Sequence, residues 1–485
     1  MPCWRCESTE SSLEERVTTW LVDYFLKTHR GVGVHQDCAP DGQVLELGFD
    51  LITIITLSLG LLPRETRKDF HGRDDETRDA ILQAGLPRLP YVSYLVEALL
   101  EAIDALLKRN LSFALSKPSW PIGVSWVVGL SHDVDHLSKW VARNLPLRVG
   151  DLKRAVREGD RILGALKSLL ATAVGPYLGR RDPYSNVGDV AQIENQKGLA
   201  ATYFLGVADP GYSPFEITYD PNTLTSSISF ASLREMGHEV GLHGSYASGD
   251  HRDSLEHEAQ QLRELSQSAV VGGRQHYLRF DRTAVSHSLR AGLLYDSSWG
   301  YWSKPGFRGG FGSPFQLGPV GVSASNRIVE IPMTIMDTSL REFLHLDPRG
   351  AAEAGNALIT EASQASGLAV INWHNSAFDR EDPRSFGQVF LELLEAVLEN
   401  HGTIWTLETI ARWWHYRDSL QASVDEDRLS VTHPDGLKAV SLRVLGNPSL
   451  VPVDEARGAR LSTDPRGRRR LTVPTAGLDA VGAAG

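Results

Sequence analysis

The chain has few cysteines and no visible export signal. Only three cysteines occur among its 485 residues, at Cys3, Cys6 and Cys38, which excludes a disulfide framework. Cys3 and Cys6 have the spacing of half a zinc site or of a redox pair, but no second pair follows, and we interpret them as incidental reduced thiols. The amino terminus has no basic segment followed by an apolar one, so we expect a cytoplasmic protein.

The sequence also lacks a long apolar run and an excess of positive charge. Its longest apolar stretch, Leu51–Leu62, has twelve residues, fewer than the roughly 20 that cross a bilayer, and we interpret it as a buried helix. Acidic residues outnumber basic ones 60 to 49, and the net charge of -11 argues against a general binder of nucleic acid or of anionic membranes. A neutral or cationic substrate fits better.

Composition changes along the chain indicate three regions and no internal repeat. Residues 1–119 are predicted to be helix-rich, because apolar residues recur at helical spacing in Leu13–Phe25 and in Tyr94–Leu107. Residues 120–415 have an α/β texture. Residues 416–485 turn polar and are predicted to form a small β-like extension, with two strands around the Pro-Asp-Gly turn of SVTHPDGLKAVSLRVLG, and a disordered tail.

The middle region contains short apolar runs that alternate with helical stretches such as Asp253–Ser266 and Phe386–Asn400. Nearly continuous apolar runs are typical of strands covered on both faces, so a parallel α/β layout is predicted, either a barrel or an open sheet. The predicted strands are Ser125–Leu130, Ala201–Val207, Glu239–His243, Ala269–Gly273, Ile328–Ile335, Ala369–Trp373 and Thr403–Leu407.

A long insertion, residues 137–200, follows the first of these strands. Its stretch LKRAVREGDRILGALKSLL is basic and amphipathic, and could touch a membrane or a partner. A solvated surface helix is the interpretation that we favour at this point.

Carboxylates and imidazoles follow several of the predicted strands. In GLSHDVDHL, Asp133 and Asp135 are two positions apart and would share one strand face with Ser131. Two carboxylates that close repel unless a cation or a proton lies between them. An isolated pair of this kind more often marks a cap or a turn, and a lone histidine more often lies in the core. The other strand ends add His243, Arg274, His276, Tyr277, Arg279, His374 and Asn375, and together they favour a divalent metal site.

These motifs resemble those of the polysaccharide deacetylase family, whose chitooligosaccharide deacetylase homology domain is a distorted (β/α) barrel. SHDVD is similar to the first motif, which implies Asp133 as the general base and Asp135 as a metal ligand. GHEVGLHGSYAS resembles the second motif, which implies His243 as a ligand. GGRQHYLRF resembles the third, which implies that Arg274 braces the catalytic carboxylate, and INWHN the fifth, which implies His374 as the general acid.

The resemblance covers residues 120–415, ending in WTLETIARWW, and the stretch GFDLITIITLSLG with the KDFHGR loop resembles a region that precedes this domain in some bacterial members. One departure stands out, because the second motif of the family has another histidine where this chain has Ala247. His276 is our first candidate for the replacement ligand, with His136 and His251 behind it. The implied metal is zinc, although the resemblance also allows relatives that act on non-sugar amides without a metal.

The resemblance implies a hydrolase that removes an N-acyl group, foremost N-acetyl, from an amino sugar of a glycan or glycan precursor. A backbone N–H near Tyr277 could help stabilise the oxyanion. Trp299, Tyr301 and Arg308 lie in a Gly-rich loop, where they could stack on a sugar or could equally be core residues. Two alternatives stay open: a non-catalytic carbohydrate-binding or scaffolding protein, for which Ala247 speaks, and a metal-independent amidase.

Overall fold

The computed structural model describes residues 69–474, with gaps at 72, 74–75, 77–79, 110–111, 141–144, 160–161, 175–180, 210–212, 214, 250–253, 281–283, 318–326, 383–385, 426–427, 433–438, 452–458 and 465. The three cysteines, the helices predicted at Leu13–Phe25 and Leu51–Leu62, and the predicted disordered tail lie outside the described residues.

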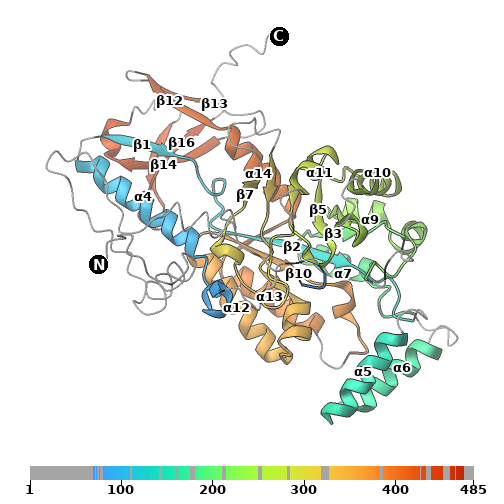
Figure 1. Ribbon diagram of the computed structural model, residues 1–485. Coiled ribbons are helices and arrows are strands. Elements are labelled where there is room, and N and C mark those ends of the chain that lie inside the picture. Colours follow the sequence, from blue (N-terminus) through green and yellow to red (C-terminus); the bar gives the residue numbers. More distant parts are fainter. Residues whose placement is uncertain are drawn as a thin grey trace, which may run out of the picture.

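Ten strands form one sheet at the centre of the protein (Figure 1). In sheet order they run β7-β8-β6-β5-β4-β3-β2-β10-β9, with β11 also paired to β2. These strands pair in parallel, except β7 with β8. Their bounds are β2 Val127–Val134, β3 Thr202–Leu205, β4 Glu239–Gly244, β5 Gly272–Gln275, β6 Tyr295–Asp296, β7 Phe315–Leu317, β8 Ile328–Glu330, β9 Ile335–Met336, β10 Leu368–Asn372 and β11 Thr403–Trp405.

The sheet curls until its two ends meet. Only residues 331–334 separate β8 from β9, although these strands lie near opposite ends of the strand order. Five residue steps reach at most about 18 Å, so the two ends must approach each other. Ile331 N–H donates to Asp296 O of β6 (2.9 Å), and Thr334 N–H donates to Val370 O of β10 (3.0 Å). The fold is a distorted (β/α) barrel, as the family resemblance implied.

Helices cover the outside of the barrel. Those of the barrel region are α7 Val187–Gln196, α8 Leu224–Ser227, α9 Phe230–Glu235, α10 Ser254–Ser266, α11 Ala284–Arg290, α12 Pro348–Gln364, α13 Phe386–Glu399 and α14 Leu407–Ser419. In α13, buried apolar residues recur every three or four positions, and this face packs into the main core beside the strands. α14 packs on β2 at Gly129, where an added Cβ would lie 2.5 Å from Leu407 Cδ2.

Segments from both sides of the barrel in sequence form a second sheet. The strands β1 Phe113–Ser116, β14 Ala439–Gly446, β16 Arg469–Pro474 and β15 Arg460–Thr463 follow one another in that order. The helix α4 (Tyr91–Arg109) is tied to this sheet by Glu97, which pairs with Arg443 at 2.8 Å. The separate regions predicted for residues 1–119 and 416–485 are therefore joined by strand pairing. Before α4 lies α3 (Ala80–Gln83), and β12 (Gln421–Asp425) and β13 (Arg428–Thr432) form a hairpin.

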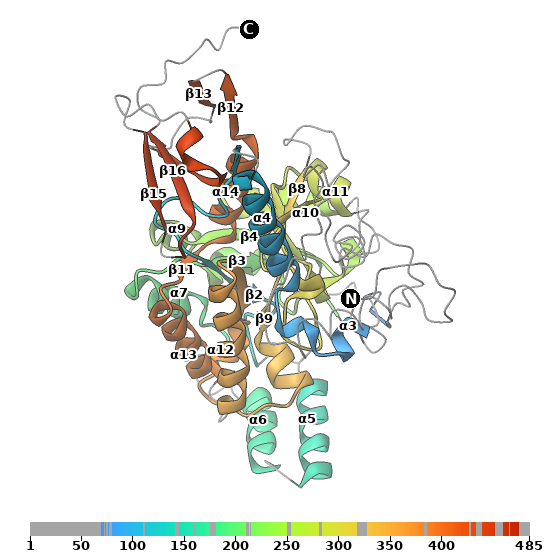
Figure 2. The ribbon, with the colours of Figure 1, turned by 90° about the vertical axis from the view of Figure 1, so that its left-hand side faces the viewer.

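The insertion after β2 forms a helical hairpin, α5 (Leu145–Glu158) and α6 (Ile162–Val174). In two views at right angles its helices lie side by side and project away from the barrel (Figures 1 and 2). Among the described residues no helix combines the length and apolar character needed to cross a membrane.

Candidate functional site

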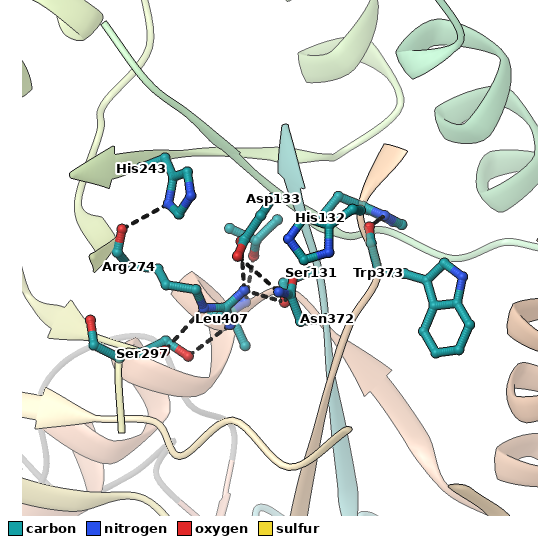
Figure 3. Close-up of polar contacts among 12 residues, drawn as sticks. Ser131, His132, Asp133, His243, Arg274, Ser297, Asn372, Trp373 and Leu407 are labelled. Atoms are coloured by element: carbon teal, nitrogen blue, oxygen red, sulfur yellow. Dashed lines mark hydrogen bonds and ion pairs between the residues drawn. The ribbon is translucent and has the colours of Figure 1, made fainter. Parts of the chain in front are cut away.

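Asp133 lies near the carboxyl end of β2, and buried donors hold both of its oxygens (Figure 3). Arg274 Nη1 donates to Oδ1 (2.8 Å), and Asn372 Nδ2 donates to Oδ2 (2.8 Å). Ser131 lies on the same strand face and accepts a bond from the same guanidinium (3.0 Å). Arg274 is itself fixed by Ser297, whose carbonyl and hydroxyl oxygens accept from its Nε and Nη2.

The surroundings of Asp133 keep it ionised. Burial raises the pKa of this carboxyl, but the positive charges of Arg274, His243 and His374 outweigh burial and bring the pKa below its ordinary value. An ionised carboxylate can accept a proton from a group that binds next to it. Each carboxylate oxygen accepts one bond from a side chain, and a second lone pair on each oxygen can serve that contact.

Asp135, two residues after Asp133, lies beside two imidazoles, those of His243 and His276. One ligand atom from each lies within 4.8 Å of the others. His243 Nε2 is 3.2 Å from Asp135 Oδ1, and His276 Nε2 is 3.6 Å from the same oxygen. Both imidazoles are buried, whereas Asp135 is partly open to solvent. The residue chosen from the sequence to replace the missing histidine is thus the one that the fold brings to this cluster.

The donor set of this cluster fits a divalent cation. His243 Nδ1 is 2.9 Å from Arg274 O, and a carbonyl can only accept, so Nδ1 carries the proton and Nε2 presents a lone pair. That lone pair faces Asp135 Oδ1, and neither atom has a hydrogen-bond partner although both are buried. Two facing acceptors need a positive charge between them, either a proton or a metal ion. Two imidazoles and a carboxylate, open on one side, form a common zinc-binding set.

Without such an ion, protons fill the same need. Burial lowers the pKa of His243, but the charges of Asp133 and Asp135 raise it above its usual value. Burial raises the pKa of Asp135, whereas His276 and His243 bring it well below its ordinary value. With or without a metal ion, the arrangement of Asp135, His243 and His276 therefore requires a positive charge between these side chains.

His374 approaches the same carboxylate from the end of β10. Its Nε2 lies 3.5 Å from Asp135 Oδ2, and its Nδ1 lies 2.6 Å from Asp337 Oδ1. Burial lowers the pKa of His374, but Asp337 and the two site aspartates raise it to about 9. Asp337 is fully buried and also accepts the His374 backbone N–H (3.1 Å), so it fixes both the ring and its backbone.

Sequence reasoning missed Asp337. The segment 328–335 was predicted as one strand, whereas the structure divides it into β8 and β9. The carboxylate follows the second of these strands directly, in IVEIPMTIMD. Collecting the first acidic residue beyond that apolar run would have found it, because parallel strands deliver such residues to the same end of the barrel.

The two alternative ligands and the loop at Ala247 lie apart from the cluster or outside the described residues. His136 contacts Thr218 Oγ1 (2.8 Å) instead of the metal-type cluster, and His251 lies outside the described residues. Near Ala247, the backbone N–H groups of residues 246 and 247 donate to the carboxylate of the buried Glu216 (3.0 and 2.7 Å). That loop is therefore held by backbone bonds, with no imidazole at position 247.

Two of the aromatic residues predicted to stack on a sugar lie in the interior. Trp299 and Tyr301 are 7% and 2% exposed. The Arg308 guanidinium packs over Trp299 at 4.3 Å, and Trp299 Nε1 donates to the Arg308 carbonyl (3.0 Å). These three residues hold one another in an ordered loop, which is the core alternative that the sequence left open. Only Tyr277 of the predicted substrate contacts adjoins the Asp135 cluster, with its ring 4.8 Å from that of His276.

An aromatic rim continues outward from Tyr277, and it includes residues that precede the barrel in sequence. We define the rim as Phe70, His71, Phe215, Tyr246 and Tyr277. The His71 ring lies 4.5 Å from Tyr277 and 5.3 Å from Phe70, and Phe70 meets Phe215 at 5.7 Å. Phe70 is 82% exposed. Aromatic contacts thus run from the buried imidazoles to the surface, a path that sequence analysis did not foresee.

Charged residues anchor the segment that carries Phe70 and His71. Glu76 is buried, and its carboxylate accepts the backbone N–H groups of Trp302 (2.8 Å) and Ser303 (3.0 Å). The Arg73 guanidinium lies over the Trp302 ring at 4.0 Å and over Tyr277 at 5.6 Å. The amino-terminal region is therefore attached to the barrel beside the site.

No family model matches the chain, and no curated protein matches its sequence. Among solved structures, a Mycobacterium smegmatis protein provisionally described as a polysaccharide deacetylase is 20% identical, with a TM-score of 0.42, covering 64% of this chain and 97% of its own. An allantoinase is 14% identical, with a TM-score of 0.39 and coverage of 62% and 93%. A family 4 carbohydrate esterase from Streptomyces lividans, in complex with acetate, is 11% identical, with a TM-score of 0.29 and coverage of 59% and 93%. Likeness at this distance identifies no activity, so function is inferred below from the geometry.

Proposed function

We propose that this protein is a hydrolase that removes an N-acyl group, foremost N-acetyl, from an amino sugar of a glycan or glycan precursor. The observation that carries the proposal is the approach of three functional groups to one point. Arg274 holds the Asp133 carboxylate. Two positions further along the chain, Asp135 meets His243 and His276, and His374, which is paired with a carboxylate of its own, approaches Asp135 from β10. Amide hydrolysis needs a base, a stabilised oxyanion and an acid, and these groups can supply all three.

Asp133 is proposed as the general base. It accepts a proton from the attacking water as the water oxygen bonds to the acyl carbon. Arg274 and Asn372 fix the orientation of its carboxylate, which limits the reorganisation needed in the transition state.

His374 is proposed as the general acid. An amine leaves poorly as an anion, so the nitrogen must receive a proton as the C–N bond breaks. Asp337 accepts from Nδ1 and thereby directs Nε2 toward Asp135, where the departing nitrogen would lie. The products are a carboxylic acid and a free amino group.

Asp135, His243 and His276 are proposed to hold a divalent cation, with zinc as the first candidate. Such an ion would polarise the amide carbonyl and make a nearby water more acidic. Tyr277 lies beside this cluster with a φ of 60°, a left-handed backbone conformation that residues other than glycine rarely adopt. The Tyr277 ring lies between the imidazole of His276 (4.8 Å) and the ring of His71 (4.5 Å), where the cluster meets the aromatic rim.

The aromatic rim supports a saccharide as substrate. The C–H faces of a sugar ring pack against flat aromatic rings, and the rim offers Phe70 and Phe215 beyond the imidazoles. A glycan bound with its acyl group at Asp133 could extend along this rim. We propose the rim as the contact for the neighbouring sugar, in place of Trp299 and Tyr301.

One experiment tests the proposal directly. Purified full chain is loaded with zinc, and its zinc content and acetate release are measured on a panel of N-acetylated saccharides, before and after chelation. We expect release that chelation abolishes and added zinc restores. Asp133→Asn should stop turnover and keep its zinc, whereas Asp135→Ala should lose both. The exposed Glu353→Gln serves as a control that changes neither.

Two outcomes would redirect the assignment. Activity that survives chelation, in protein shown to be free of metal, would favour the metal-independent amidase. Bound zinc without hydrolysis of any saccharide in the panel would favour the non-catalytic binding protein.

A further inference from the structure

The hairpin of α5 and α6 exposes an unusual number of apolar side chains. Among the described residues, 14 large hydrophobic side chains are exposed, and seven of them lie on these two helices. They are Val149, Val156, Ile162, Leu163, Leu166, Leu170 and Val174, with exposed fractions between 38% and 65%. Scattered single residues of this kind are ordinary on protein surfaces, but a cluster marks an interaction site.

The spacing of these residues orients them as one stripe. On α6, Ile162, Leu166, Leu170 and Val174 follow one another every four residues, which places them along one side of the helix. Leu163, the most exposed of the seven at 65%, adjoins the stripe at its amino-terminal end. The inner contacts between the helices use other positions, since Ala155 is buried and Ala165 and Leu169 are half-buried. The stripe is therefore left over after the hairpin has packed on itself.

The local charge of the hairpin is opposite to that of the chain. Residues 145–174 contain six basic and three acidic residues, for a net charge of +3, whereas the chain carries -11. Lys153 and Arg157 on α5 and Lys167 on α6 are exposed. An exposed apolar stripe beside basic side chains is the pattern of helices that lie in the interface of an anionic bilayer.

The position of the hairpin suits a planar partner. It projects from the barrel, so a flat surface can reach the helices without contacting the rest of the protein (Figures 1 and 2). An anionic membrane is planar and suits both features of the hairpin, because its acyl chains accept the apolar stripe and its headgroups attract the lysines and the arginine.

We propose that the hairpin of α5 and α6 attaches the protein to the surface of an anionic membrane, with the stripe of α6 in the interface. This inference goes beyond the proposed hydrolase and does not depend on it. The overall charge of the chain argued against such binding, but the basic residues concentrated on the hairpin act at short range, where screening by salt leaves them effective.

The test is flotation of the purified full chain with two kinds of vesicle, one of phosphatidylcholine alone and one mixed with phosphatidylglycerol. We expect wild-type protein to float with the anionic vesicles and to bind less at high salt. The variant Leu163→Glu/Leu170→Glu should bind at least about tenfold more weakly, since two leucines leave the apolar phase and two negative charges enter. The matched control is Leu450→Glu/Leu461→Glu, whose leucines are similarly exposed at 45% and 40% on another part of the surface.

Each outcome bears on the proposal. Retained binding by the control together with loss by the hairpin variant supports it, provided that circular dichroism shows the same helix content in both. Failure of wild-type protein to float with either vesicle overturns it, as does equal loss in the control. A wild-type dimer that Leu163→Glu/Leu170→Glu converts to a monomer, with no flotation, would assign the stripe to a second copy of the chain instead.

Discussion

Asp133 and Asp135 lie two positions apart on one strand, yet their partners differ completely. Asp133 accepts bonds from a guanidinium and an amide, whereas Asp135 faces three imidazoles and has one buried oxygen without a hydrogen-bond partner. Fixed donors suit a group that must keep its orientation, and unsatisfied acceptors suit a group that binds a cation. The chemistry assigned to each carboxylate follows from this contrast.

His276 provides the sharpest test of the metal cluster. His276→Ala removes one of its three ligands, so zinc affinity should fall by about 100-fold or more, beyond the loss seen when only an outer partner is removed. Competition with a chromogenic chelator measures the affinity, and elemental analysis gives the stoichiometry. His136→Ala is the control, because that imidazole contacts Thr218 instead. An unchanged zinc stoichiometry and affinity in His276→Ala would reject His276 as a ligand.

Asp337 is proposed to act through His374 as a positioning residue. Asp337→Asn keeps the side-chain size but weakens the bond to Nδ1 and removes the buried negative charge. We expect kcat to fall by about 10² to 10⁴-fold, while KM and zinc content stay near the wild-type values. A loss of thermal stability that accounts for the missing activity, or a rise in KM with kcat unchanged, would speak for a merely structural role.

Sequence patterns located most of the site because they needed only the ends of strands. Asp133, His243, Arg274 and His374 each follow or end an apolar run, and parallel strands bring such ends together. The apolar pattern did not separate β8 from β9, so residues 328–335 were predicted as one strand. It also could not tell whether Trp299 faces solvent or core, since a Gly-rich loop has no periodicity from which to assign a face.

Six of the seven predicted strands occur as single strands and the seventh, at residues 328–335, is two, because a strand buried on both faces has a nearly continuous apolar sequence. The pairing of β1 with β14 had no such signal. The two strands lie more than 300 residues apart in the chain, and every residue of β1 is only half-buried. Contacts at that separation depend on how the barrel between them folds, which local patterns do not specify.

Glu239 on β4 joins three other elements of the barrel. Its carboxylate accepts from Thr202 Oγ1 of β3 (2.6 Å), Tyr295 Oη of β6 (2.7 Å) and the Glu408 N–H of α14 (2.8 Å). Burial raises the pKa of Glu239 to about 7, although these three bonds oppose the rise. The folded state therefore binds a proton more tightly than the unfolded chain does.

This difference predicts a pH-dependent stability. The contribution of Glu239 is fully present below its unfolded pKa of 4.5 and is lost as the pH rises through about 7. Glu239→Gln cannot ionise, so between pH 5 and pH 8 its unfolding free energy should improve relative to wild type by about 2 to 3 kcal/mol. Urea denaturation at both pH values measures the change. A pH dependence of Glu239→Gln equal to that of wild type would contradict the assignment. The exposed Glu353→Gln is the control and should keep the wild-type pH dependence.

Two parts of the chain outside the barrel contact other regions of the protein. Its amino-terminal part reaches the site through Glu76, Arg73 and the aromatic rim, whereas β1 ties the same part to the carboxyl-terminal sheet. The barrel alone would thus lack both the outer wall of its site and the partner strand of β14. The three-part division expected from composition stays a prediction, and the described parts of the two flanking regions are linked by the pairing of β1 with β14.

Phe70 tests whether this outer wall binds substrate. Its ring is exposed and lies two aromatic contacts beyond Tyr277, so a single amino sugar at Asp133 would not reach it, whereas a longer glycan would. Phe70→Ala should raise KM for an N-acetylated oligosaccharide between about 2-fold and 10-fold, the effect of one lost aromatic contact. KM for the monosaccharide, kcat for both substrates and zinc content should not change. The exposed Leu398→Ala, on α13, is the control. An equal rise in KM for both substrates would show instead that Phe70 supports the site indirectly through His71.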